Sequence, residues 1–115
     1  MTTPDDKIER MVDLVRKGEI TVFVRRAHDF EAADLADVLA ALEEKERVAV
    51  VHALPAELSS HALAEMPEDA HAGETLAALD PGRAAEIVEE LEDDDAADIL
   101  GELPVAEQER ILKEV

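Results

Sequence analysis

Carboxylate side chains dominate one short segment near the C-terminus of this 115-residue chain. Between Glu86 and Glu102 there are nine of them and no lysine or arginine: Glu86, Glu89, Glu90, Glu92, Asp93, Asp94, Asp95, Asp98 and Glu102. If Glu92 or Asp93 caps a helix over residues 94–103, Asp94 and Asp98 lie one turn apart on one face, with Asp95 beside them. Because Mg²⁺ binds through one or two carboxylates and keeps several waters, such a pair can hold one Mg²⁺ ion.

A purely structural interpretation of the same acidic segment stays open. Acidic residues in the first turn of a helix complement the helix dipole, and the remaining carboxylates can form a solvated face. The run Asp93–Asp98 is not a calcium-binding EF-hand loop, because it lacks the glycine at the sixth position and the glutamate at the twelfth. The residues alone therefore allow either a Mg²⁺ site or an acidic surface.

Other kinds of chemistry find little support. There is no cysteine, so a disulfide framework and a thiolate zinc site are excluded. The histidines have no metal-binding spacing, and we expect them at or near the surface: His28, His52, His61 and His71. The sequence contains no nucleophile elbow and no glycine-rich phosphate loop, so we expect neither catalytic residues nor a cofactor-binding site.

The charge of the chain is unevenly distributed. The formal net charge is −19. Residues 1–28 hold six basic and five acidic side chains (+1), whereas residues 29–115 hold five basic and 25 acidic ones (−20). Such a surface repels nucleic acids and anionic membranes, and it favours metal ions or a basic protein surface as partners. With no long apolar run and no signal-peptide pattern, we expect a soluble, cytosolic chain.

An apolar residue that returns at an almost constant interval predicts how the acidic segment is positioned. The successive spacings are 12, 12, 13, 12, 12 and 12 for Leu42, Leu54, Met66, Leu79, Leu91, Leu103 and Val115. Further residues, all apolar except Thr75, stand three and four positions before each of these anchors, as one face of an α-helix requires. A helix this short is unstable alone, so each repeat must pack on its neighbours. The pattern predicts an all-α solenoid of about eight or nine short helices.

Residues 1–28 are predicted to form a helical cap before the acidic repeats of residues 29–115. We expect a first helix over residues 5–17, ended by Gly18, and a short helix over residues 19–28. The second helix is predicted despite its strand-forming residues, because the chain offers no second strand for pairing. Asp80 and Pro81 have the pattern of an N-cap and first helical residue, and Pro55, Pro67 and Pro104 mark similar corners. The extra residue of the one 13-residue interval falls in residues 67–73, where Gly73 is expected to permit a looser turn or a register correction.

Three segments resemble the N-terminal cytosolic domain of MgtE-type magnesium transporters: residues 32–39, residues 79–91 and, most specifically, residues 93–104. The resemblance runs from about residue 8 to residue 115. It implies a right-handed superhelix that precedes a pair of CBS domains and a membrane domain, both absent from this chain.

The resemblance also implies a function. In that family the domain senses Mg²⁺ and keeps the pore closed when cytosolic Mg²⁺ is high, because ions bridge its acidic groups to those of the CBS domains. By motif, the ligands on this chain correspond to Asp94 and Asp98, with Asp95 beside them. A homodimeric full-length protein, at the cytoplasmic face of the membrane, is the implied setting. The related superhelix of the flagellar motor switch keeps open an alternative function as a metal-independent module that docks a basic protein.

Overall fold

The computed structural model describes residues 4–115, and residues 1–3 of the predicted cap lie outside this range. Within it, nine α-helices and one 3₁₀ helix follow one another without a strand, which confirms the predicted all-α class. Their bounds are α1 Pro4–Arg16, α2 Ile20–Ala27, α3 Ala32–Ala41, α4 Glu44–Ala53, α5 Ala56–Glu65, η1 Glu68–Ala70, α6 Ala72–Ala78, α7 Pro81–Glu90, α8 Asp93–Leu100 and α9 Val105–Leu112. None of these helices is long and apolar enough to cross a bilayer.

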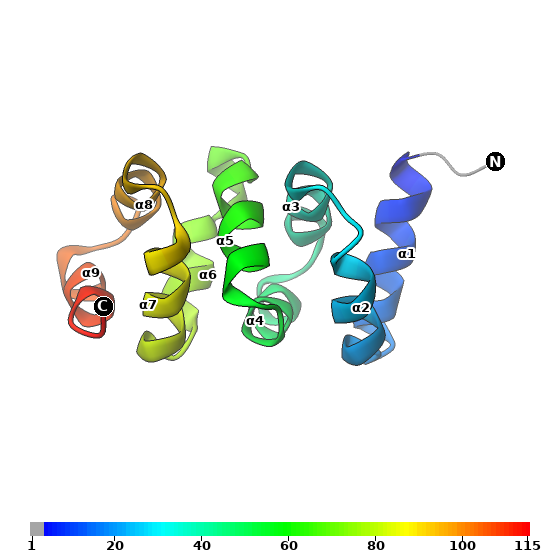
Figure 1. Cartoon of the computed structure of the whole chain (residues 1–115), viewed down its shortest axis with the longest axis horizontal. Helices are drawn as coiled ribbons and strands as arrows, with labels where there is room; N and C mark the ends of the chain where they lie inside the picture. Colours follow the sequence, from blue (N-terminus) through cyan, green and yellow to red (C-terminus); the bar gives the residue numbers. More distant parts are fainter. Residues whose placement is uncertain (1–3) are drawn as a thin grey trace.

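Each helix packs mainly on the next but one in the chain. The odd-numbered helices α1, α3, α5, α7 and α9 form one row, and α2, α4, α6 and α8 form a second. The two rows build an elongated body of 46 × 23 × 21 Å, with α1 and α9 at opposite ends (Figure 1). This arrangement is the stacking that the short repeat predicts, and the right-handed sense of the superhelix stays a prediction.

The apolar anchors of the repeat form the corners between helices. Leu42, Leu54, Met66, Leu79 and Leu91 are the C-caps of their helices and have extended backbone, with ψ between 143° and 161°. In most corners the anchor N–H donates to the carbonyl three residues earlier, for example Leu91 to Val88 at 3.1 Å. One further extended residue then caps the next helix. A ten-residue helix plus this two-residue corner makes up the 12-residue period.

The corner prolines divide into two kinds. At Asp80–Pro81 the prediction is confirmed, since the Asp80 carboxylate accepts the Gly82 N–H at 3.1 Å and Pro81 is the first helical residue. Pro55, Pro67 and Pro104 instead occupy the N-cap position itself, where their backbone is extended. Both placements suit proline, because the first N–H groups of a helix have no partner within it.

The predicted apolar stripe forms the core except at two positions of the last repeat, where only Ile111 is buried. Every anchor from Leu42 to Leu103 is at most 9% exposed, and so are the residues three and four positions before each anchor. Leu112 and Val115 are 47% and 56% exposed at the equivalent positions. The difference arises because, among the described residues, no helix packs beyond α9.

The segment after Gly18 is helical, as predicted. Gly18 has a φ of 78° and ends α1, a conformation that glycine adopts without strain. In α2, Phe23 and Ala27 are completely buried and anchor the helix against the rest of the stack. Tertiary packing therefore outweighs the β-branched residues around Phe23, whose intrinsic preference for strands is small.

The expected role of Gly73 is wrong. The extra residue of the 13-residue interval is taken up by η1 and by His71, which adopts the left-handed conformation at φ 63°, ψ 44°. Gly73 is the second residue of α6 and is buried. Its role lies in close packing against α8, because a Cβ at this position would be 2.9 Å from the Ile99 carbonyl oxygen.

Three arginines of the repeats donate to backbone carbonyls near helix C-termini. Arg47 is only 6% exposed and donates to Leu39 O at 3.4 Å and to Leu42 O at 3.2 Å. Arg83 donates to the carbonyl of Leu54, the C-cap of α4. Arg110 donates to Ala77 O in α6 at 3.1 Å. Positive charge is stabilising at these ends, since helix C-termini carry unsatisfied carbonyls and partial negative charge.

Truncation of the stripe should cost stability only where the stripe is covered. We expect Leu100→Ala to lower the free energy of unfolding by about 2–5 kcal/mol, through lost burial and a residual cavity. Leu112→Ala changes the equivalent position of the next repeat, which is half exposed, and should cost roughly a third as much or less. Urea unfolding followed by far-UV circular dichroism measures both. Equal costs would show that the two positions are equally buried in solution.

Removing the buried Arg47 should lower the free energy of unfolding more than removing the exposed Arg110, which also donates to a backbone carbonyl. Arg47→Met leaves the Leu42 carbonyl without this donor, takes one of two donors from the Leu39 carbonyl and removes the donor to the Thr75 hydroxyl. We expect the free energy of unfolding to fall by about 2–4 kcal/mol. Arg110→Met should cost well below that, because the Arg110 side chain is 50% exposed and water can replace its bond to Ala77. The midpoints of urea unfolding measure the stability of the two variants. A smaller loss of stability in Arg47→Met than in Arg110→Met would contradict this ranking.

Candidate metal centre

The acidic segment folds into the corner between α7 and α8 and the first turn of α8. Leu91 is 9% exposed and turns the chain, and Glu92 follows with extended backbone as the N-cap of α8. Asp93, Asp94 and Asp95 make up the first turn of the helix. The predicted helix over residues 94–103 is therefore present in shorter form, because Gly101 already caps its C-terminus.

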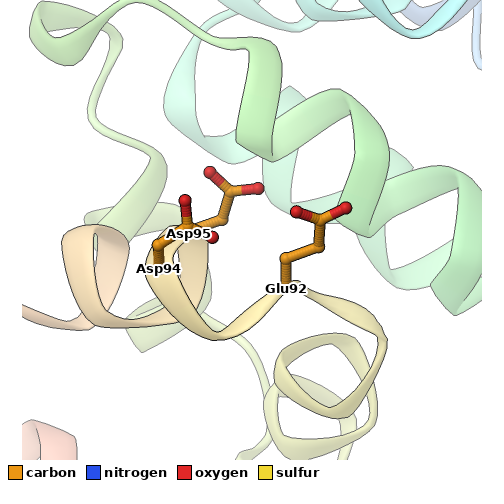
Figure 2. A group of neighbouring side chains, drawn as sticks. All are labelled: Glu92, Asp94 and Asp95. Atoms are coloured by element: carbon orange, nitrogen blue, oxygen red, sulfur yellow. The ribbon is translucent and has the colours of Figure 1, made fainter.

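Three of these carboxylates come together at the start of α8. Glu92, Asp94 and Asp95 each offer an oxygen atom, and the three atoms lie within 4.8 Å of one another. Figure 2 shows the side chains projecting from the first turn of α8 into the space beside α5. Glu92 and Asp94 are exposed and Asp95 is half-buried. We call these three residues the α8 carboxylate cluster.

The structure brings together only part of the predicted ligand set. Asp94 and Asp95 belong to the cluster, whereas Asp98 lies one turn further along α8 and is not a member. Glu92 was expected only as a possible cap. Its side chain makes no capping hydrogen bond, so its carboxylate is available to the cluster. Glutamate is too long to be a preferred N-cap residue, and this is the signal that could have assigned Glu92 to the cluster.

Two adjoining hollows of about 190 and 200 Å³ lie between α5 and α8, and we call them together the α5–α8 groove. Asp95 and Ala64 line both hollows. The other carboxylates along the groove are Glu65, Glu90, Glu92, Asp98 and Glu102. His61 is its only basic side chain among the described residues. The groove therefore extends the negative potential of the α8 carboxylate cluster along one side of the stack.

No cation within the described part of the chain neutralises this region. The four ion pairs found there join Arg16 to Glu46, His71 to Glu74, Arg83 to Glu86 and Arg110 to Glu107. None of them involves a member of the α8 carboxylate cluster. The N–H groups at the start of α8 offset some of the repulsion, and the rest favours an external cation. Exposed carboxylate oxygens suit Mg²⁺, because that ion keeps several of its waters when bound.

Comparison with known proteins identifies the family. The sequence profile described as MgtE intracellular N domain matches residues 30–115. The chain belongs to this family. Its resemblance to MgtE N domains at the level of sequence motifs is thereby confirmed.

One solved structure supports the same fold. It is described as the crystal structure of the soluble part of a magnesium transporter, and it matches this N domain with a TM-score of 0.84 at 18% sequence identity. The match covers 98% of this chain and 44% of that chain, so the chain spans less than half the length of the structure it resembles. At this identity the likeness establishes the fold only. No curated protein sequence matches the chain.

The histidines of this N domain are not gathered into a metal site. All four are exposed, in accord with the sequence prediction. His28 Nδ1 lies 2.9 Å from Val24 O, and His71 Nδ1 lies 3.6 Å from a Glu74 carboxylate oxygen. His61 alone faces the acidic segment, across the α5–α8 groove. A hard, oxygen-preferring cation therefore suits the α8 carboxylate cluster better than a zinc-like ion.

Removing a single charge from α8 should have opposite consequences at its two ends. Asp98 is in the last turn, where both the helix dipole and Asp94 disfavour its charge, so Asp98→Asn should stabilise by roughly 0.2–0.5 kcal/mol. Asp93→Asn at the first position gives up a favourable dipole interaction and should gain nothing. Urea unfolding at about 20 mM and 500 mM NaCl measures both, and the gain at Asp98 should shrink in the high salt. A gain that persists undiminished in high salt would refute the electrostatic origin.

Proposed function

We propose that this domain is the Mg²⁺-sensing regulatory domain of an MgtE-like magnesium transporter, on the cytoplasmic side of the membrane. Membership of the MgtE N domain family supports the proposal. So does the fold shared with the soluble part of a magnesium transporter. The observation that carries it is the α8 carboxylate cluster, whose three oxygens lie within 4.8 Å of one another and take part in none of the ion pairs of the described residues.

The proposed mechanism rests on shared ligands. Asp94 and Asp95 with Glu92, or with Asp98 as the motif implies, supply the oxygens of this domain, and acidic groups of neighbouring CBS domains supply the others. Mg²⁺ contributes the positive charge that lets two acidic surfaces approach. The closed pore is favoured only to the extent that the ion binds the closed arrangement better than the open one. Because half of the ligands lie elsewhere, this domain alone should bind Mg²⁺ weakly.

A second function has its own support. Six carboxylates line the α5–α8 groove, and Leu91 and Met66, each only 9% exposed, add apolar atoms to its lining. A basic protein segment would fit such a groove without any metal. This interaction module would lose affinity with rising salt regardless of the cation used, whereas a Mg²⁺ sensor responds to Mg²⁺ specifically.

A comparison of Mg²⁺ with NaCl at matched ionic strength tests the proposal. Millimolar Mg²⁺ should stabilise the domain beyond the effect of NaCl, since salt screens all carboxylates alike while a bound ion acts at one site. At ten times the dissociation constant the gain is about 1.4 kcal/mol by linkage. Asp94→Asn with Asp95→Asn should abolish the Mg²⁺-specific part, measured by thermal unfolding. The control variant Asp37→Asn with Glu89→Gln removes the same amount of charge outside the cluster. It should retain the Mg²⁺-specific stabilisation.

Single variants separate the two possible ligand sets. If the cluster binds the ion as its geometry suggests, Glu92→Gln should weaken the Mg²⁺ response more than Asp98→Asn does. The reverse order would favour the ligand pair implied by the family motif. If the wild type and the Asp94/Asp95 variant respond identically to Mg²⁺, both in the isolated domain and in the full-length transporter, the sensor proposal fails. The interaction module is then the better explanation.

A further inference from the structure

The start of α6 adopts a conformation that needs support from its surroundings. His71 is the only non-glycine residue with positive φ in the described chain, and it directly precedes α6. Its carbonyl accepts the Thr75 hydroxyl at 3.2 Å, and Thr75 Oγ1 in turn accepts the Nε–H of buried Arg47 at 2.8 Å. A left-handed residue outside glycine is strained and persists only where neighbouring bonds over-determine it. The first turn of α6 is thus held firmly from the side of α4.

The opposite side of this turn is pressed against the C-terminal end of α8. A Cβ at Gly73 would lie 2.9 Å from the Ile99 carbonyl oxygen, closer than real Cβ contacts allow, and 3.0 Å from Glu102 Cβ, which is tighter than most of them. The Gly73 N–H also donates to Glu102 Oε1 at 3.3 Å. This N–H is one of the first in α6 and has no partner inside the helix, so a carboxylate there is favoured. Only glycine permits both the approach and the bond.

The same short helix, α8, carries the cluster at its start and the Ile99 carbonyl that faces Gly73 near its end. Asp95, Asp98, Ile99 and Glu102 line one wall of the α5–α8 groove, and Ala72 beside Gly73 lines the other. Because α8 has only eight residues, a shift at Ile99 displaces or rotates its first turn as well. The separation of α6 and α8 therefore determines where the cluster carboxylates stand relative to α5.

We propose that Gly73 and Glu102 are positioning residues for the ion site at the start of α8. The absent side chain at Gly73 sets how closely α8 approaches α6, and the bond from Gly73 N–H to Glu102 sets how α8 is rotated. Neither residue belongs to the α8 carboxylate cluster. This inference rests on the proposed function, since it concerns the geometry of the same Mg²⁺ site. It goes beyond the proposed function because it assigns a role to two residues that are not ligands, and a different experimental result would overturn it.

The decisive variant is Gly73→Ala, compared with Gly82→Ala. Both place alanine in the first turn of a helix, but a Cβ at Gly82 meets only the flexible Asp80 carboxylate, at 3.2 Å. Titration with MgCl₂ at constant ionic strength, followed by the amide resonances of Asp94 and Asp95, gives the dissociation constants. We expect Gly73→Ala to weaken Mg²⁺ binding about tenfold, as loss of support around metal ligands does, and Gly82→Ala to leave it unchanged.

The outcomes separate this inference from the proposed function. If the wild type binds and Gly73→Ala binds equally well, even with a lower melting temperature, Gly73 has a purely structural role and the inference is overturned. If the wild type shows no Mg²⁺-specific change in its resonances or stability, the ion site in this chain fails and the inference fails with it.

A second measurement applies if Gly73→Ala does not fold. In the wild type, the Gly73 amide resonance should shift with the same Mg²⁺ dependence as those of Asp94 and Asp95, because its acceptor Glu102 directly follows the C-cap of α8. Glu102→Gln keeps an oxygen acceptor and should preserve the binding constant within about twofold, whereas Glu102→Ala should weaken it severalfold. A stationary Gly73 resonance, together with equal affinities of the two Glu102 variants, would rule out the positioning role.

Discussion

The whole structure depends on burying an apolar stripe that spans fewer than three helical turns. A helix of eight to ten residues is unstable by itself, so each one is held by the helices two positions before and after it. The anchors complete this scheme, since an extended, buried residue such as Leu54 or Leu91 ends one helix and aims the next. Because such a corner takes only two residues, the rows can stack closely, and small core residues allow the helices to approach.

The shortness of the corners also influences how charge is distributed over the surface. A corner this short leaves carbonyls without partners at the end of each helix, and Arg47, Arg83 and Arg110 donate to some of them. The repeats contain only two other basic residues, Lys45 and Lys113. Most of the positive charge of residues 29–115 thus serves the fold itself. In the described part of the chain none of the ion pairs reaches the α8 carboxylate cluster, so the use of these arginines in packing leaves the charge of the cluster unneutralised by them.

Much of the fold could be predicted from the sequence, because the stripe and its anchors are repeated many times and every copy supports the same interpretation. The single irregular interval is harder to predict, because the sequence indicates a turn residue at Gly73. In the structure the positive φ falls on His71, and the glycine makes room for Ile99 of α8. That contact joins residues distant in the sequence and leaves no local pattern. Only part of the candidate site could be predicted from the sequence, for a related reason. Helical spacing relates Asp94 to Asp98, but only the corner geometry shows that Glu92 turns back toward Asp95.

The position of the α8 carboxylate cluster at a helix N-terminus limits the cost of bringing three carboxylates together. Unit charges about 4–5 Å apart repel by roughly 1 kcal/mol in water and by more near a protein surface. Each acidic residue in a first turn recovers about 0.3–1 kcal/mol from the helix dipole. Where water screens the charges fully the two effects are of similar size, which limits the net cost of three converging carboxylates. The dipole offsets only part of their repulsion, however, and the remainder is available to favour a divalent cation. Had the same residues stood at the C-terminus of α8, dipole and repulsion would have acted in the same direction, and the cluster would have destabilised the short helix that carries it.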